Sequence, residues 1–164
     1  VILSNIYLDK LDKELESRNL RFARYADDCI IFVKSEMSAN RVMKSVTSWL
    51  ERKLFLKVSA KKTKVVRPTK GQFLGFTFYR AKTVWKCTPT KDGKKRLYSN
   101  IQKYLERKHA ASRPLSVTFE KLNQMIRGWI RYFKISSIKG FLDKFGQWLR
   151  HKVRSISIKL SFNC

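Results

Sequence analysis

Two adjacent aspartates, Asp27 and Asp28, are the residues of this sequence whose type and position best suit chemistry. They lie between two short apolar segments, in a chain with 12 acidic residues against 37 Lys and Arg. Adjacent carboxylates repel, so a tight turn that holds both favours a compensating cation. Carboxylate oxygens suit Mg²⁺, which keeps several waters and is usually completed by substrate phosphates. Aspartates also favour tight turns without any ligand, so the residues alone leave both interpretations open.

The segments around the aspartate pair are predicted to form a β-hairpin packed by helices. Arg21–Tyr25 and Cys29–Val33 are short, and the second is β-branched and aromatic enough to be a buried strand. Apolar residues recur at helical spacing over about 2–17 and again over about 38–54, which predicts two amphipathic helices. Ser38 stands where an N-cap would begin the second helix.

The second half is predicted to contain a small β region followed by a three-helix unit. Phe73–Tyr79, Thr83–Cys87 and Lys94–Tyr98 have the composition of strands, and Asp92-Gly93 has the chemistry of a hairpin turn. Helical periodicity dominates from Tyr98 onward and is interrupted only near Pro114. The predicted fold class is therefore α+β, with a mainly helical final part.

The charge of the chain points to a polyanionic partner. The formal net charge is +25, of which residues 1–78 hold +8 and residues 79–164 hold +17. A folded chain with 13% aromatic residues keeps such self-repulsion most readily where nucleic acid supplies counter-charge. Three widely spaced cysteines indicate neither a zinc site nor a disulfide framework, and no apolar run could span a bilayer. A cytoplasmic protein without a membrane partner is expected.

A predicted helix in the second half has one apolar face and one basic face. Its apolar stripe includes Trp129 and Phe133, which we expect to belong to the core rather than to stack on bases. The opposite face is expected to track phosphates, since A-form duplexes are gripped largely through their backbone. The residues of that face recur at i, i+3, i+7 and i+10, and they are Gln124, Arg127, Arg131 and Lys134. The basic residues expected to extend it are Arg107, Lys108, Arg113, Arg150, Lys152 and Arg154.

Several motifs, taken in order, resemble those of group II intron reverse transcriptases and maturases over roughly residues 2–153. Phe22–Asp28 with the apolar strand after it resembles the YADD box of reverse transcriptases. Leu3–Leu15 looks like the helix before that box, and Lys62–Lys64 like the basic block after it. Phe73–Phe76 resembles the primer-grip hairpin. Arg127–Trp129 with Tyr132-Phe133 is similar to the thumb, also called domain X.

The resemblance implies a partial reverse transcriptase palm, a β-hairpin with packed helices, followed by a mainly helical thumb. Residues 1–78 would be palm, 79–98 a connecting β region and 99–164 thumb. Asp27 would be the principal metal ligand and Asp28 its supporting carboxylate. The residues implied at the primer end, the incoming nucleotide or the primer backbone are Tyr25, Ala26, Lys62, Phe73, Leu74 and Gly75. Without the resemblance, Gly75 could equally mark a bulge in an ordinary strand.

The family's pattern includes another catalytic aspartate on an earlier palm strand and a fingers region, and this sequence opens after both. The implied function is an RNA-directed DNA polymerase segment that binds intron RNA, template and DNA primer, and supplies part of a two-metal nucleotidyl-transfer site. It is not expected to polymerise alone, and a separate upstream palm and fingers polypeptide is a candidate partner. The alternative is a non-catalytic maturase-type RNA-binding module that assists splicing.

Overall fold

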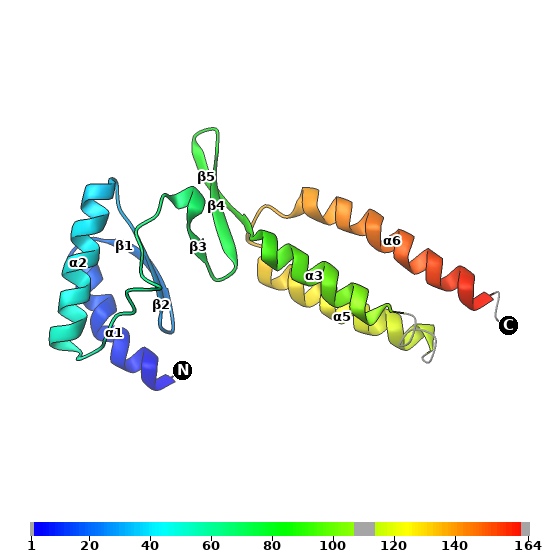
Figure 1. The fold of residues 1–164 in the computed structure, drawn as a ribbon, viewed down its shortest axis with the longest axis horizontal. Helices are drawn as coiled ribbons and strands as arrows, with labels where there is room; N and C mark the ends of the chain where they lie inside the picture. Colours follow the sequence, from blue (N-terminus) through cyan, green and yellow to red (C-terminus); the bar gives the residue numbers. More distant parts are fainter. Residues whose placement is uncertain (1, 107–113, 162–164) are drawn as a thin grey trace. The chain divides into compact units, whose positions relative to one another are not determined.

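The computed structural model describes residues 2–106 and 114–161, and the chain divides into two compact units (Figure 1). The first unit comprises Val1–Arg67 and the second Pro68–Cys164. Among the described residues, no helix is long and apolar enough to cross a membrane.

The first unit consists of two helices and a β-hairpin, as the sequence predicts. Helix α1 spans Ile2–Ser17, and helix α2 spans Glu36–Lys53. Strands β1 (Arg21–Tyr25) and β2 (Asp28–Phe32) pair antiparallel, from Arg21 opposite Phe32 at one end to Tyr25 opposite Asp28 at the other. This register leaves a two-residue turn, which places the aspartate pair at the tip of the hairpin.

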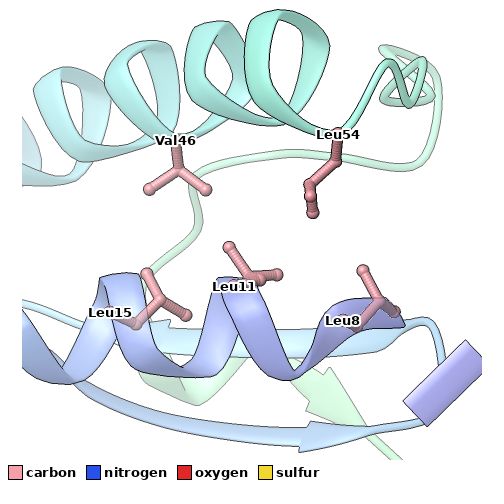
Figure 2. Close-up of a cluster of buried hydrophobic side chains, with 5 residues drawn as sticks. All are labelled: Leu8, Leu11, Leu15, Val46 and Leu54. Atoms are coloured by element: carbon pink, nitrogen blue, oxygen red, sulfur yellow. The ribbon is translucent and has the colours of Figure 1, made fainter. Parts of the chain in front are cut away.

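The core of this unit lies between α1 and α2. Figure 2 shows Leu8, Leu11 and Leu15 of α1 facing Val46 and Leu54 of the second helix and its C-cap. The spacing of three and four residues puts the three leucines on one face of α1. Each fully buried leucine contributes roughly 1.5–3 kcal/mol of transfer free energy. Partly buried side chains of both strands pack against the same cluster, so the hairpin is fixed to the helices.

The N-cap of helix α2 lies three residues earlier than predicted, so Ser38 is not the N-cap and the helix begins at Glu36. Ser35 holds that position, with extended backbone, and its side chain accepts a hydrogen bond from the backbone N–H of Ser38 at 3.2 Å. Both serines suit a cap by composition. Ser35 is followed by Glu36 in the first turn, where a negative charge favours the helix dipole.

The second unit opens with a small sheet. A short 3₁₀ helix, η1 (Pro68–Lys70), leads into strands β3 (Gln72–Phe73), β4 (Phe76–Ala81) and β5 (Val84–Pro89). All neighbours pair antiparallel in the order β3-β4-β5. The predicted strand over Phe73–Tyr79 is thus two strands separated by a tight turn.

Within the described residues, three long helices follow this sheet: α3 (Lys91–Tyr104), α5 (Leu115–Phe133) and α6 (Lys139–Ser161). Their common core joins side chains of all three, and α3 lies beside α5 (Figure 1). Its buried members are Leu97, Ile101, Leu105, Leu122 and Phe145. The chain is therefore α+β, with small antiparallel sheets and helices first and a mainly helical region after them.

The prediction of a strand over Lys94–Tyr98 is wrong, because that segment lies inside α3. Asp92-Gly93, which resembles a hairpin turn in sequence, forms the first turn of the helix. The Thr90 side chain accepts a hydrogen bond from the backbone N–H of Gly93 at 3.1 Å, which caps the helix. Leu97 and Ile101 then recur at helical spacing and are buried, so packing decides the structure.

Candidate functional site

Asp27 and Asp28 lie at the exposed tip of the β1–β2 hairpin. Tyr25 and Asp28 close the ladder, so Ala26 and Asp27 form the turn. Ala26 has φ = +53°, a left-handed conformation that is uncommon for a residue with a Cβ. Both aspartates are exposed, and in the described part of the chain neither joins an ion pair. Both carboxylates are thus free to meet a ligand outside the chain.

One side chain of β1 ties this turn to helix α1. The Arg24 guanidinium forms a two-pronged ion pair with Asp12, and its Nη1 donates to the carbonyl oxygen of Ala26 at 2.8 Å. The hydrogen bond to Asp12 raises the pKa of Arg24 further above its ordinary value. The turn that bears the aspartates is therefore connected to the helix by a charged, part-buried contact.

Cys29 lies on the same face of the hairpin as Arg24, its partner across the two strands. Desolvation of the thiol, with a smaller contribution from the negative charge of Asp12, raises the pKa of Cys29 to about 11. The Arg24 charge acts in the opposite direction. The thiol is therefore protonated at neutral pH and is a poor nucleophile or metal ligand there.

The second predicted site, Phe73 to Gly75, forms a tight hairpin turn between β3 and β4. Phe73 pairs with Phe76, and the two turn residues Leu74 and Gly75 have φ of +49° and +77°. Positive φ at both positions defines a primed turn of the kind that suits the twist of a hairpin. Gly75 is thus a turn residue, not a bulge in a strand.

Both carbonyl oxygens of this turn are bonded within the second unit. Tyr132 of α5 donates its hydroxyl to the Leu74 oxygen at 2.9 Å, and the backbone N–H of Thr90 donates to the Gly75 oxygen at 2.8 Å. The Phe76 ring stacks on Tyr132 at 5.7 Å between centroids. The turn is therefore held rigidly against the end of α5, with Gly75 itself exposed.

Lys62 lies in the first unit, in a turn closed by the backbone of Ser59, and is exposed. Asp27, Asp28, Tyr25 and Ala26 belong to the same unit, and Phe73 to Gly75 belong to the second. The predicted catalytic and primer-binding residues are thus divided between the two units, and within the described residues no hydrogen bond joins Lys62 to the hairpin tip.

The predicted basic face of α5 is exposed along its whole length. Its four members share one side of the helix, while the opposite stripe is partly or fully buried. Trp129 donates its indole N–H to the Gly93 oxygen at 3.3 Å and lies 4.6 Å from Phe133 and 5.1 Å from Phe141 between centroids. The prediction that Trp129 and Phe133 are core residues is confirmed. The exposed members are Gln124, Arg127, Arg131 and Lys134.

Arg150, Lys152 and Arg154 are exposed on α6. Arg150 and Arg154 are four residues apart and share a face, whereas Lys152 lies on the opposite side by helix geometry. A single surface therefore does not include all three. The predicted contributions of Arg107, Lys108 and Arg113 lie outside the described residues.

The donor chemistry of the hairpin tip fits a hard divalent cation in part. Asp27 and Asp28 offer exposed carboxylate oxygens of the type that Mg²⁺ prefers. Across residues 2–106 and 114–161, however, no group of three or more His, Cys, Asp or Glu is placed to hold a metal. Within the described residues the tip thus offers two exposed carboxylates but no complete metal site.

Comparison with known families assigns the two parts of the chain. Residues 1–78 match the family model described as reverse transcriptase (RNA-dependent DNA polymerase), and residues 94–160 match the group II intron, maturase-specific domain. The first match identifies the class of the protein as a reverse transcriptase. The second match identifies the group within that class, the proteins with a group II intron maturase domain. The chain belongs to the group II intron reverse transcriptase and maturase family. No match to a curated protein was found.

Four residues support the two turns through contacts that were not predicted from the sequence, although some of these residues lie in the motifs above. They act through contacts between residues distant in the chain, which no local pattern displays. For Tyr132, its position beside the buried Phe133 offered a partial signal, because a tyrosine near a core seeks a partner for its hydroxyl. These residues are Asp12, Arg24, Thr90 and Tyr132.

Proposed function

We propose that this chain is an RNA-directed DNA polymerase segment of a group II intron-encoded protein. It binds template, primer and intron RNA, and it supplies two carboxylates to a nucleotidyl-transfer site. The observation that supports this best is the pair of exposed aspartates at the hairpin tip, within the segment that matches reverse transcriptases. Residues 1–78 act as palm, 79–98 as connection and 99–164 as thumb.

Each residue has a distinct task in this proposal. When bound, the divalent cations activate the primer hydroxyl and neutralise charge on the leaving phosphates. Asp27 is the principal ligand and Asp28 its support. Tyr25 and Ala26 lie by the primer end, and the exposed ammonium group of Lys62 approaches the nucleotide phosphates. The rigid turn formed by Leu74 and Gly75, with Phe73 before it, holds the primer backbone.

The basic surface of α5 supports a second candidate, a non-catalytic maturase-type module that stabilises folded intron RNA. Three cations and one amide are exposed in a row within the segment that matches the maturase-specific domain. That arrangement suits phosphate contacts and needs no metal. The two functions are compatible, because they use different surfaces.

The Asp27→Asn variant separates the two candidates. We expect no primer extension with Mg²⁺ and nucleotides by this chain alone, and extension when an upstream fingers and palm polypeptide is mixed with it. Asp27→Asn should abolish that extension and leave RNA affinity unchanged or higher, because it removes a ligand and one negative charge. Asp9→Asn is the matched control, since it removes an exposed carboxylate of the same unit that pairs with Lys13 on its own helix.

Two results would contradict the polymerase proposal. Robust extension by the unmixed chain would mean that other residues complete the site. Failure of every mixture to extend primers, with tight and salt-dependent RNA binding retained, would leave the maturase-type module as the function.

A further inference from the structure

The side chain of Arg24 makes four hydrogen bonds, and neither the proposed polymerase function nor the proposed RNA-binding function assigns a role to them. Its Nε and Nη2 bond both carboxylate oxygens of Asp12, at 2.7 and 2.5 Å. Its Nη1 donates to the Asn5 side-chain oxygen at 3.0 Å and to the Ala26 carbonyl oxygen at 2.8 Å. The side chain is only 10% exposed, although Arg24 lies in a short strand beside an exposed turn. Two of these partners, Asn5 and Asp12, belong to α1.

The Ala26 carbonyl is the important acceptor, because it belongs to the peptide group that joins Ala26 to Asp27. The orientation of that peptide plane determines the direction in which the Asp27 side chain leaves the backbone. Ala26 has a left-handed φ of +53°, and alanine has no polar side chain with which to stabilise it locally. Such a conformation persists only where surrounding contacts impose it. The bond from Arg24 is a contact of that kind.

We propose that Arg24 is a positioning residue for the aspartate pair, and that Asp12 and Asn5 of α1 hold it in place. The inference rests on the proposed function in one respect, that Asp27 and Asp28 bind a divalent cation. Arg24 itself touches neither substrate nor metal. It transmits the rigidity of the packed helix to the turn, so that both carboxylates are presented in one fixed geometry.

The chemistry of the contact explains why arginine suits this position. A guanidinium group can engage a carboxylate with two parallel bonds and still direct another N–H elsewhere, whereas a lysine ammonium lacks that planar fork. Asp12 also compensates the Arg24 charge. An uncompensated cation so close to the turn would compete with a metal ion for the Asp27 carboxylate.

Arg18 provides a matched control in the same unit. It pairs with Glu14 of α1 at 2.6 Å and donates to Ser45 of α2 at 2.9 Å, with side-chain exposures of 30% and 27% in the pair. The ion pair lies at the end of α1, the hydrogen bond to Ser45 joins that end to α2, and neither contact reaches the turn. Arg18→Met therefore removes a comparable ion pair without affecting the aspartates.

The test uses the full chain with Arg24→Lys, Arg24→Met, Asp12→Asn and Arg18→Met, and Mn²⁺ as the probe. One readout is the Ala26 φ, from the NMR coupling of its amide and Cα protons and from its Cβ shift, without metal. The other is the Mn²⁺ concentration that half-broadens the Asp27 and Asp28 amide signals. Both substitutions of Arg24 should release Ala26 from positive φ and weaken Mn²⁺ binding about 10- to 100-fold, the usual cost of losing a residue that orients a ligand.

Asp12→Asn should weaken Mn²⁺ binding in the same direction, and Arg18→Met should change neither readout. The proposal is overturned if Arg24→Lys keeps both the Ala26 conformation and the Mn²⁺ midpoint, or if Arg18→Met shifts them equally. Should Arg24→Met fail to fold, Arg24→Lys decides. Absence of Mn²⁺ broadening in the unsubstituted chain would contradict the proposed metal function, and the Ala26 coupling would still decide the role of Arg24.

Discussion

At the scale of single residues, the β1–β2 turn and the β3–β4 turn are stabilised in the same way. Each contains a non-glycine residue at positive φ, Ala26 in one and Leu74 in the other. In each, a side chain donates to the carbonyl oxygen of that residue: Arg24, two residues earlier in the same hairpin, to Ala26, and Tyr132 of α5 to Leu74. The left-handed region costs an ordinary residue roughly 1–2 kcal/mol, so these hydrogen bonds offset backbone strain in both turns.

Cys29 offers a pH-dependent prediction at the same scale. Its raised pKa of about 11 lowers the thiolate fraction at pH 8 by roughly two orders of magnitude relative to an ordinary thiol. A more basic thiolate is also more nucleophilic, which recovers about one of those orders. We therefore expect Cys29 to react with iodoacetamide roughly tenfold more slowly in the folded chain than in urea, as followed by peptide mass spectrometry.

The raised pKa of Cys29 also predicts how the stability of the fold changes with pH. Because folding raises this pKa, the protonated thiol stabilises the fold below about pH 9, and that contribution is lost as the pH rises towards 11. Equal alkylation rates in the folded and unfolded chain at pH 8 would contradict the raised pKa.

At the scale of elements, the sequence predicts well where packing follows a simple period. Helix α1 and the β1–β2 hairpin match their predicted bounds to within a residue, because Leu8, Leu11 and Leu15 recur at helical spacing and the second strand is β-branched and aromatic. The prediction fails at Lys94–Tyr98. There, Asp92-Gly93 suits either a turn or the first turn of a helix, and the burial of Leu97 and Ile101 together with the Thr90 cap favours the helix.

The residues of the candidate site also comprise some that the sequence predicts and some that it does not. The aspartate pair and the basic row of α5 could be found from residue type and spacing, because each is contiguous or periodic in the sequence. The residues that brace the two turns could not, since Arg24 reaches Asp12 on another element, and Tyr132 reaches Leu74 across 58 positions. Such contacts exist only once the elements have packed.

Trp129 provides the prediction for the element scale. Its ring packs among Phe133 and Phe141, and its N–H is bonded to α3, so it joins α3, α5 and α6. Trp129→Ala should reduce the free energy of unfolding by roughly 3–5 kcal/mol, measured by urea denaturation, because it leaves a large cavity. Phe119→Ala is the control on the same helix, because Phe119 is 40% exposed and should cost much less. Unchanged unfolding with lost RNA binding would instead identify Trp129 as a base-stacking residue.

At the scale of the whole molecule, the net charge of +25 predicts RNA binding that weakens steeply with salt. If Arg127, Arg131 and Lys134 contact phosphates, replacing all three with Ala should reduce the slope of log K against log salt by about 0.7–0.9 for each phosphate that is no longer neutralised. The affinity should fall uniformly across RNA sequences, because phosphate contacts carry no sequence information. Filter binding over a range of salt concentrations measures both quantities.

A second triple variant tests whether position matters as well as charge. Lys10, Lys34 and Lys44 are exposed residues of the first unit, and replacing them with Ala removes the same three charges. We expect a smaller reduction of the slope for this control. Equal reductions would mean that binding depends on total charge and that the α5 face has no special role.

The aromatic contacts of the β3–β4 turn determine where this chain can be divided. The reverse transcriptase match ends at residue 78, yet Phe76 lies against Tyr132 and Phe133, and the second compact unit begins at Pro68. A chimera joined at residue 78 would transfer the helices without Phe76, and Tyr132 and Phe133 would lose their native aromatic partner. A junction between Arg67 and Pro68 transfers the turn together with its support. Exchange of the helical region between members of the family should therefore give soluble protein at the junction between Arg67 and Pro68 and insoluble protein at residue 78.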